Sequence, residues 1–267
     1  MHTFQFMDKY TVQVHHHLAQ NDNAKHITIV ILPAIGVAIK KYDQLSQQLA
    51  IQGYDVIAAD YPCCGANQPQ VHRGIDYNYR DLIDDFIPQL LSFSKTPTSI
   101  LLGHSLGGQL ASLFSTEHHI DVIGIATGDI HYKNWQGLGQ LKILAVATLF
   151  SILSKLYGYF PGYKVGFSDK ETKGVIQDWG RMVFRGIRRI YTRSAQDSKS
   201  QQSQGFGYFI SIKNDNFAPI SITQALAKLF VNSHIDTVCL PVELKGNPHS
   251  VWLKTPQVII EKIVHKY

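Results

Sequence analysis

The sequence of 267 residues has few of the features that mark secreted proteins, beginning with cysteine. It contains three cysteines, and two of them, Cys63 and Cys64, are adjacent, where a disulfide between them is strained. The third, Cys239, lies in an apolar run, and we expect it to pack as a small hydrophobic side chain. A chain without a disulfide framework is typical of a reducing compartment, so we predict a cytoplasmic protein.

Targeting and membrane-spanning patterns are also missing. Residues 1–9 have no basic start followed by an apolar core, so we expect no signal peptide. The apolar run Ile143 to Ser154 lies between Lys142 and Lys155 and is too short to span a membrane. Such a run most often forms the core of a helical unit. An acyl pocket or a lipid-facing surface is the second interpretation, which leaves contact with a membrane surface open.

Motifs for nucleic acids, metals and cofactors are absent as well. The formal net charge of +5 is a mild excess, and no nucleic-acid-binding motif accompanies it. The sequence has no H-E-x-x-H and no G-x-G-x-x-G after a strand, so we predict neither a metal nor a cofactor. His15, His16 and His17 are consecutive, and neighbours on a strand point to opposite faces. We interpret them as part of a polar edge strand and not as a metal site.

What the sequence does contain is one informative stretch, residues 99–108, which reads SILLGHSLGG. An apolar run that suits a buried parallel strand leads into Gly103-His104-Ser105-Leu106-Gly107, which fits G-x-S-x-G. A serine on such a sharp strand-to-helix turn requires very small neighbours two residues away on each side, and both are glycine. The pattern predicts that the Ser105 hydroxyl is an exposed nucleophile and that the Leu106 N–H is free to bind an oxyanion.

The residues around this turn indicate a layered α/β domain. Four apolar segments predict strands, and helices separate several of them, an order that implies a parallel sheet. The predicted strands are 27–32, 55–60, 99–102 and 121–127, and the predicted helices are 40–52, 79–91 (kinked or divided by Pro88) and one that follows Ser105. A Gly-rich strand–helix connection without chemistry is the alternative interpretation of the turn.

The alternation of strands and helices stops near Gly128 and resumes after Gln204. We therefore predict an α/β core of residues 1–127 and 205–267, with residues 128–204 inserted as a mainly helical cap. The cap segment holds the apolar run and a set of arginines, and it ends in the polar linker 194–204. After it we expect strands at 207–212 and 237–244, and helices at 219–230 and from Pro256 onward.

These features together make the chain resemble the α/β-hydrolase superfamily, over about residues 10–127 and 205–267. Within it, the chain is most similar to capped α/β hydrolases without an assigned activity, of the serine hydrolase or lysophospholipase type. The likeness rests on Gly103 to Gly108 and on the segments 32–36 (LPAIG), 158–162 (GYFPG) and 215–219 (DNFAP). It implies an α/β-hydrolase fold, a mostly parallel sheet flanked by helices.

The resemblance also implies a triad in the chain order Ser, Asp, His. Asp215 follows a predicted strand and precedes Pro219, and His249 lies between the last strand and the last helix, where the family places its acid and base. Many relatives have His-Gly at the first oxyanion loop, and this chain has Pro33-Ala34 instead. Because the donor there is a backbone N–H, the resemblance makes Ile35 the first donor and Leu106 the second.

Two neighbouring residues compete for these roles. Asp129 follows the strand 121–127, a position where some α/β hydrolases carry the acid, so Asp129 stays an alternative to Asp215. His104 is the histidine nearest to Ser105 in sequence, but in a tight turn its side chain should point away from the serine hydroxyl. An imidazole ordinarily titrates near neutrality, which suits His249 to accept and return a proton.

The predicted function is a serine hydrolase that cleaves a carboxylic ester or thioester through an acyl-enzyme. Its substrate would be a small acyl compound, and the aliphatic and aromatic content of the cap suggests an apolar one. An acyltransferase would use the same three residues. A non-catalytic module that binds a ligand or partner on the same scaffold is the alternative from another functional class, because fold alone does not establish catalysis.

Overall fold

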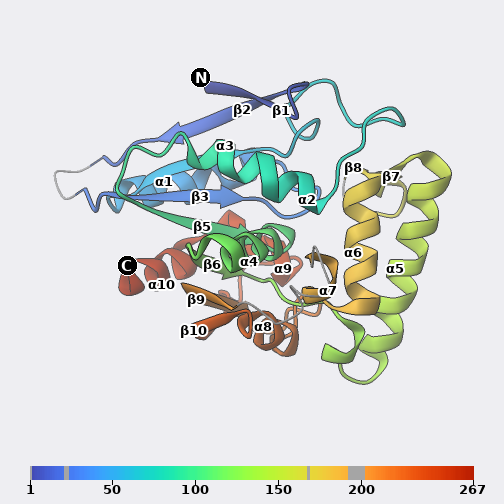
Figure 1. The fold of residues 1–267 in the computed structure, drawn as a ribbon. Coiled ribbons are helices and arrows are strands. Elements are labelled where there is room, and N and C mark those ends of the chain that lie inside the picture. Colours follow the sequence, from blue (N-terminus) through green and yellow to red (C-terminus); the bar gives the residue numbers. More distant parts are fainter. Residues whose placement is uncertain (1, 21–23, 167–168, 192–201) are drawn as a thin grey trace.

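The centre of the molecule is an eight-stranded sheet (Figure 1). The computed structural model describes residues 2–20, 24–166, 169–191 and 202–267. The strands are β1 (His2–Phe6), β2 (Tyr10–His17), β3 (Ile27–Leu32), β4 (Asp55–Ala59), β5 (Thr98–His104), β6 (Asp121–Ile125), β9 (Ser203–Ile212) and β10 (Phe230–Val238). Their order is β1-β2-β4-β3-β5-β6-β9-β10. β2 is antiparallel to β1 and β4, and the other neighbours are parallel, which confirms the predicted fold class.

The strand that ends at the nucleophile turn lies in the middle of this sheet. β5 pairs with β3 on one side and with β6 on the other, so that Ile100 lies between Ile29 and Asp121. Strands buried on both faces are continuous apolar runs, as β3 and β5 are. The carboxyl end of β5 is therefore held by two neighbouring strands, and the turn that follows it begins from a fixed point.

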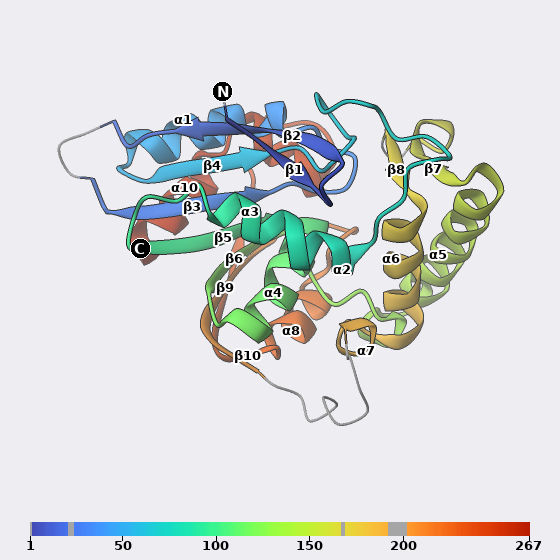
Figure 2. The ribbon, with the colours of Figure 1, turned by 45° about the horizontal axis from the view of Figure 1, so that its top comes forward.

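Helices cover both faces of the sheet (Figure 2). α1 (Asp43–Ile51) and α10 (Gln257–Lys266) contact each other on one face. α2 (Tyr79–Asp81), α3 (Ile87–Leu91) and α4 (Leu106–His118) cover the other. α2 and α3 are joined by a single π-helical turn, η2 (Leu82–Phe86), and Pro88 stands in the first turn of α3. The helix predicted at 79–91 is thus interrupted by this π-helical turn just before Pro88, while the backbone stays helical through Phe86 and Ile87.

Further short helices complete the core around the sheet. η1 (Ile39–Tyr42) leads directly into α1, and α8 (Ile220–Ala227) packs on β9 and β10. α9 (Pro248–Val251) and η5 (Trp252–Lys254) lie between β10 and α10 in the chain, and η5 contacts both η1 and α1. The segment that carries His249 is therefore packed against the start of α1.

Several elements differ from the sequence prediction. The last strand is β10, and the predicted strand 237–244 is wrong in all but its first two residues. β10 is an edge strand with mostly exposed, polar side chains, so it lacks an apolar signature, whereas the apolar residues after it form a loop. Cys239 lies in that loop and is exposed, which corrects its predicted packing. β1 was not predicted. It covers β2 only up to Val14, so His15 to His17 pair with β4 alone.

The segment after β6 is mainly helical, as predicted, with one small sheet that was not predicted. It contains η3 (Tyr132–Asn134), α5 (Leu138–Tyr157), β7 (Tyr159–Pro161), η4 (Gly162–Lys164), β8 (Lys170–Thr172), α6 (Lys173–Arg185) and α7 (Arg188–Tyr191). β7 and β8 form an antiparallel pair. Residues 194–201 of the predicted linker lie outside the described residues, as does Arg193 from the set of arginines in this segment. Ser203 already opens β9. The exact cap boundaries stay a prediction.

This helical segment is attached to the core at the end of the sheet toward which the parallel strands point (Figure 2). Several of its contacts are with residues 73–79. The Thr172 hydroxyl donates to the Tyr77 carbonyl at 2.9 Å, and the Tyr79 N–H donates to Asp178 at 3.1 Å. Arg73 also donates to the carbonyl of Leu156 at 2.9 Å. The carboxyl edge of the strands is where α/β proteins bind ligands, so the segment lies beside the expected site.

Candidate active site

The turn after β5 holds Ser105 in a strained conformation. Ser105 has φ 52° and ψ −112° and precedes the first residue of α4. A non-glycine residue with positive φ is uncommon and persists where the surroundings fix it. Here its N–H donates to the Ile125 carbonyl at 3.0 Å, and its own carbonyl accepts from the Thr127 hydroxyl at 2.6 Å. The backbone of the serine is thereby bound on both sides to β6 and the residues that follow it.

Neighbouring backbone leaves no space for a side chain at either glycine of the turn. A Cβ on Gly103 would lie 2.3 Å from the backbone of Gly107, and one on Gly107 would lie 2.0 Å from the Leu32 carbonyl oxygen. Both contacts are with backbone, which cannot move aside as a side chain can. The G-x-S-x-G spacing therefore follows from a close approach of β5, the start of α4 and the end of β3.

Three of the predicted site residues meet at this turn. The His249 Nε2 atom lies 2.9 Å from the Ser105 hydroxyl oxygen, and the His249 Nδ1 atom lies 2.8 Å from Asp215 Oδ2. A carboxylate only accepts, so Nδ1–H donates to Asp215 and Nε2 is left to accept from the serine hydroxyl. The arrangement matches a nucleophile, a base within hydrogen-bond reach and a group that orients the base.

The carboxyl of Asp215 is held in place on its second oxygen. Oδ1 accepts from the N–H groups of Phe217 at 2.8 Å and Ala218 at 3.1 Å. The Asp215 side chain is 0% exposed and that of His249 is 17% exposed. The loop after β9 therefore fixes which oxygen faces the imidazole.

The competing residue Asp129 has other partners. Its Oδ1 accepts from the N–H groups of His131 at 3.2 Å and Ile187 at 3.1 Å. Burial raises the pKa of the Asp129 carboxyl. These bonds join the residues after β6 to the turn between α6 and α7. Asp129 thus connects the first residues of the helical segment to the turn between α6 and α7. Within the described residues it makes no hydrogen bond to His249.

The loop after β3 offers one backbone donor next to two that are in use. The Ala34 N–H donates to the Tyr42 hydroxyl at 2.8 Å, and the Gly36 N–H donates to Glu171 at 2.8 Å. Within the described part of the chain, the Ile35 N–H between them has no acceptor. Leu106 is the first residue of α4, so its N–H has no acceptor within the helix. These are the two donors that the sequence predicted for an oxyanion.

His104 points away from the serine, as expected, and joins two loops of the site. Its Nε2 atom lies 2.8 Å from the His249 carbonyl, and its Nδ1 atom lies 2.8 Å from the Tyr42 hydroxyl. Burial holds the pKa of the His104 imidazole well below its usual range, so the ring is neutral. A carbonyl only accepts, so Nε2 carries the hydrogen and Tyr42 donates to Nδ1. A continuous chain of hydrogen bonds therefore runs from the Ala34 N–H to the backbone of His249.

The backbone of His249 has two further partners. Its carbonyl also accepts from the indole N–H of Trp252 at 3.1 Å, and its N–H donates to the Asn247 side chain at 3.1 Å. Trp252 is fully buried. With its backbone bound on both sides, His249 can keep its imidazole between Ser105 and Asp215 without relying on the side-chain bonds alone.

Glu171 in β8 is a residue that the sequence analysis did not single out. It is 1% exposed, and besides Gly36 it lies 3.8 Å from the Cys64 sulfur. Burial raises the pKa of its carboxyl to about 7. Glu171 connects the helical segment to the loop that carries Ile35. Nothing in the sequence near position 171 distinguishes it from an ordinary surface glutamate, so no local signal pointed to it.

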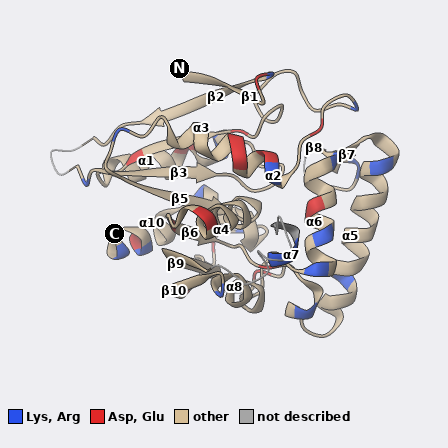
Figure 3. Cartoon of the chain, viewed as in Figure 1, with Lys and Arg blue, Asp and Glu red and all other residues tan. Residues whose placement is uncertain are grey.

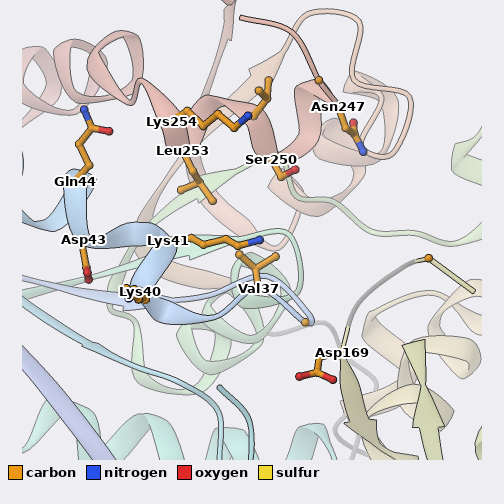
Figure 4. A pocket seen from close by; sticks show the side chains of 14 residues that line it. Val37, Lys40, Lys41, Asp43, Gln44, Asp169, Asn247, Ser250, Leu253 and Lys254 are labelled. Carbon is orange, nitrogen blue, oxygen red and sulfur yellow. The ribbon is translucent and has the colours of Figure 1, made fainter. Parts of the chain in front are cut away.

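A cleft of about 940 Å³ opens next to the two loops that carry Ile35 and His249 (Figure 4). Gly36 and Asn247 line it, together with Lys41 from η1 and Lys254 from η5. Ser105 is not among the lining residues, so the cleft adjoins the site without containing the nucleophile. Within the described residues, no group of three or more metal-ligating side chains is found in the molecule.

The comparisons with known proteins agree with this fold. The model of the Alpha/beta hydrolase family matches residues 29–262, so the chain belongs to the alpha/beta hydrolase family. No curated protein matches the chain. The family assignment and the fold therefore rest on the family model and on solved structures.

Many solved structures share the fold at low sequence identity. A soluble variant of monoglyceride lipase from Saccharomyces cerevisiae, solved with a substrate analog, aligns with a TM-score of 0.69 at 13% identity, covering 99% of this chain and 94% of that one. Est1E from Butyrivibrio proteoclasticus with bound ferulic acid gives 0.65 at 12% identity, covering 100% and 98%. Monoacylglycerol lipase from Paleococcus ferrophilus gives 0.64 at 14% identity, covering 96% and 99%. At these identities the likeness establishes the fold.

Proposed function

We propose that the chain is a serine hydrolase that cleaves a carboxylic ester or thioester through an acyl-enzyme. The observation that carries the proposal is the hydrogen-bonded series Ser105–His249–Asp215, with distances of 2.9 and 2.8 Å. In this proposal Ser105 is the nucleophile, His249 the general base and Asp215 the group that orients it. Ile35 and Leu106 supply the N–H groups of the oxyanion hole.

In the acylation step, the Ser105 oxygen attacks the carbonyl carbon of the substrate while His249 Nε2 takes the hydroxyl proton. Negative charge then develops on the carbonyl oxygen, where the N–H groups of Ile35 and Leu106 stabilise it. His249 returns the proton to the leaving alkoxide or thiolate, and the bond to the leaving group breaks. Asp215 stabilises the positively charged imidazole that exists between these two proton transfers.

In the deacylation step, a water molecule replaces the leaving group. His249 removes a proton from the water as it attacks the acyl carbon, and the oxyanion is stabilised as before. Return of the proton to the Ser105 oxygen breaks the acyl–serine bond and releases a carboxylic acid. An acyltransferase would differ only in using an alcohol or amine in place of water, with the same three residues.

For the substrate, we propose a small ester or thioester with an apolar acyl group. Solved structures of the same fold include two monoacylglycerol or monoglyceride lipases and a protein with bound ferulic acid, which supports an acyl substrate. We further propose that residues 128–204 form a cap that lies over the site and holds the acyl group. The bond from Glu171 to Gly36 supports this, because it joins the helical segment to the oxyanion loop.

The test is covalent labelling by a fluorophosphonate probe together with release of nitrophenol from short- and medium-chain nitrophenyl esters. We expect the wild type to take up the probe and to turn over the esters, and Ser105→Ala to do neither. Ser92→Ala is the matched control, because Ser92 is an exposed serine whose hydroxyl donates to the Gln89 carbonyl. Chelators should have no effect on turnover.

Two outcomes would replace the proposal. If neither the wild type nor Ser105→Ala is labelled and both act equally slowly on esters and thioesters, the chain is a binding module on a hydrolase scaffold. If the wild type is labelled and forms an acyl-enzyme that an added alcohol consumes much faster than water does, it is an acyltransferase. Mass spectrometry of the intact protein separates these cases, since the acyl group adds its mass to Ser105.

A further inference from the structure

The outer face of α5 carries a continuous apolar stripe, and among the described residues no other element packs on it. α5 packs against α6 through residues such as Ile143, Ala147 and Phe150, and it is the outermost helix of its segment (Figure 1). Its opposite face exposes six apolar side chains at helical spacing, with the leucines and isoleucine 47–70% exposed. They are Leu138, Leu141, Ala145, Leu149, Ile152 and Leu156, and we call them the α5 stripe. Contiguous exposed patches of this kind mark interaction sites.

Positive charge surrounds this stripe. On a helix with 3.6 residues per turn, Lys142 lies along one border of the stripe and Lys155 along the other, and both are exposed. Residues 128–191 contain ten Lys or Arg and four Asp or Glu, although the whole chain has a formal net charge of only +5. Two of the four acidic residues, Glu171 and Asp178, are buried. The positive excess of the protein is thus concentrated on the segment that carries the stripe (Figure 3).

We propose that the α5 stripe is a docking surface for a lipid bilayer with anionic headgroups. The helix would lie in the plane of the interface, with its leucines among the acyl chains and Lys142 and Lys155 at the headgroups. An apolar face bordered by lysines is the pattern of helices that lie on membranes, and anionic lipids add attraction for each basic residue. The proposal goes beyond ester hydrolysis and does not depend on it.

The charge pattern favours a bilayer over a second copy of the chain. In a symmetric dimer built on the stripe, the same surface appears on both subunits, so both copies would bring the same positive charge to the interface. Like charges brought together in this way weaken the contact. An anionic bilayer instead presents opposite charge to the whole border.

The packing also favours docking over spanning. α5 as a whole is, by length and composition, a helix that could cross a membrane, which corrects the expectation that the run Ile143 to Ser154 belongs to an element too short to span one. However, its inner face is bound to α6, where Gln177 donates to the Ser154 hydroxyl at 2.7 Å and to the Ser151 carbonyl at 3.0 Å. The carbonyls of Leu156 and Tyr157 at its C-terminus accept from Arg73 of the core. A spanning helix would have to give up these contacts.

The experiment is vesicle flotation of the full chain carrying Ser105→Ala, so that hydrolysis of lipid cannot influence the result. Vesicles consist of phosphatidylcholine alone or of phosphatidylcholine mixed with phosphatidylserine. We expect binding to the mixed vesicles that weakens with added salt, and much weaker binding to phosphatidylcholine alone. Because catalysis is disabled, failure of this experiment leaves the proposed hydrolase activity untouched, and failure of the ester assay leaves docking untouched.

Paired variants separate the stripe from general surface effects. In the same background, Leu149→Asp combined with Ile152→Asp should weaken binding by more than about a hundredfold. The matched control is Leu18→Asp, because Leu18 is 60% exposed just after β2, at the end of the sheet opposite to the helical segment. Lys155→Ala should weaken binding about fivefold, and Lys95→Ala, an exposed lysine before β5, should leave it unchanged.

Three results would overturn the proposal. The first is absence of binding to either vesicle, or equal loss in the stripe variant and in Leu18→Asp. The second is a wild-type dimer in light scattering that the stripe variant converts to a monomer without any vesicle binding, which would make a second copy the partner. The third is retention in the vesicles after washing with alkaline carbonate, which would mean that α5 is inserted across the bilayer.

Discussion

The nucleophile turn of the core is tightly enclosed by neighbouring backbone, whereas α5, the outer helix of the helical segment, is open on one side. A Cβ on Gly107 would lie 2.0 Å from a backbone oxygen, whereas one on Gly139 in α5 would first meet the Trp135 ring at 3.4 Å. Around Ser105 the neighbouring backbone leaves no room, while Leu141 and Leu156 of α5 are about two-thirds exposed. The turn is fixed by contacts within the chain, whereas the outer face of α5 is exposed.

Two aspartates, Asp215 and Asp129, allow the core and the helical segment to be compared. Asp215 is bound to His249, and Asp129 to the helical segment, although both are carboxylates in loops that follow strands. Their environments thus assign them to different regions. Substitutions at both positions test whether catalysis depends on the aspartate of the core and not on the aspartate of the helical segment.

The largest effect is expected for Asp215→Asn, which should lower kcat about ten-thousandfold, because an amide at this position no longer holds the imidazole in the productive tautomer. Asp129→Asn should change kcat less than about tenfold, since the Asp129 carboxyl accepts from backbone N–H groups of the helical segment and lies away from the imidazole of His249. Steady-state kinetics on a nitrophenyl ester measures both. The reverse order of effects would mean that Asp129, and not Asp215, is the acid of the triad.

The next largest effect is expected from adding one methyl group to the turn. Gly107→Ala should lower the free energy of unfolding by about 4 kcal/mol, because its Cβ would overlap the Leu32 carbonyl. Gly139→Ala in α5 should raise it by up to about 1 kcal/mol, since alanine is the better helix former and its Cβ would meet the Trp135 ring at an ordinary contact distance. Urea unfolding compares the two. Equal midpoints would mean that the turn relaxes around the added methyl group and is no more tightly packed than α5.

A pH effect is expected at the contact between the cap segment and the core. Burial raises the pKa of Glu171 to about 7 from the ordinary 4.5, so the folded state binds more protons between these values than the unfolded state. Stability therefore falls as pH rises through this window, by up to about 3 kcal/mol. In Glu171→Gln this contribution is absent.

Thermal unfolding of the wild type and of Glu171→Gln between pH 5 and pH 8, values that bracket most of this window, measures the difference. Glu243→Gln, at an exposed glutamate in the loop after β10, is the control and should follow the wild type. Parallel curves for the wild type and Glu171→Gln would show that Glu171 does not titrate in this range.

The smallest effect is expected for Tyr42→Phe. The change removes the hydroxyl that accepts from the Ala34 N–H and donates to His104, and it should cost about 1 to 2 kcal/mol. Because the oxyanion loop loses one support, kcat should fall severalfold with little change in KM. Tyr163→Phe in the cap segment is the control, since Tyr163 is 51% exposed and should change neither quantity. A fall in stability without any change in kcat would limit Tyr42 to a structural role.

Much of the fold was predictable because buried strands and helices leave a local pattern. The predicted strand at 27–32 has the observed bounds of β3, and the turn around Ser105 has glycine where backbone comes close. Membership of the alpha/beta hydrolase family is confirmed over residues 29–262. The edge strand β10 was placed wrongly because it is mostly solvated and lacks that pattern. The cytoplasmic location and the cap boundaries remain predictions.

By itself, the sequence determined the class of the fold, the nucleophile turn and the residues available for its chemistry. Residue types at short spacings carry these properties, as G-x-S-x-G and the apolar runs do. Only the tertiary structure decided which aspartate faces His249, since 34 residues separate Asp215 from His249 in the chain. It also decided that Glu171 and Tyr42 hold the loop of Ile35 on either side, because such bonds form between segments that the chain order does not bring together.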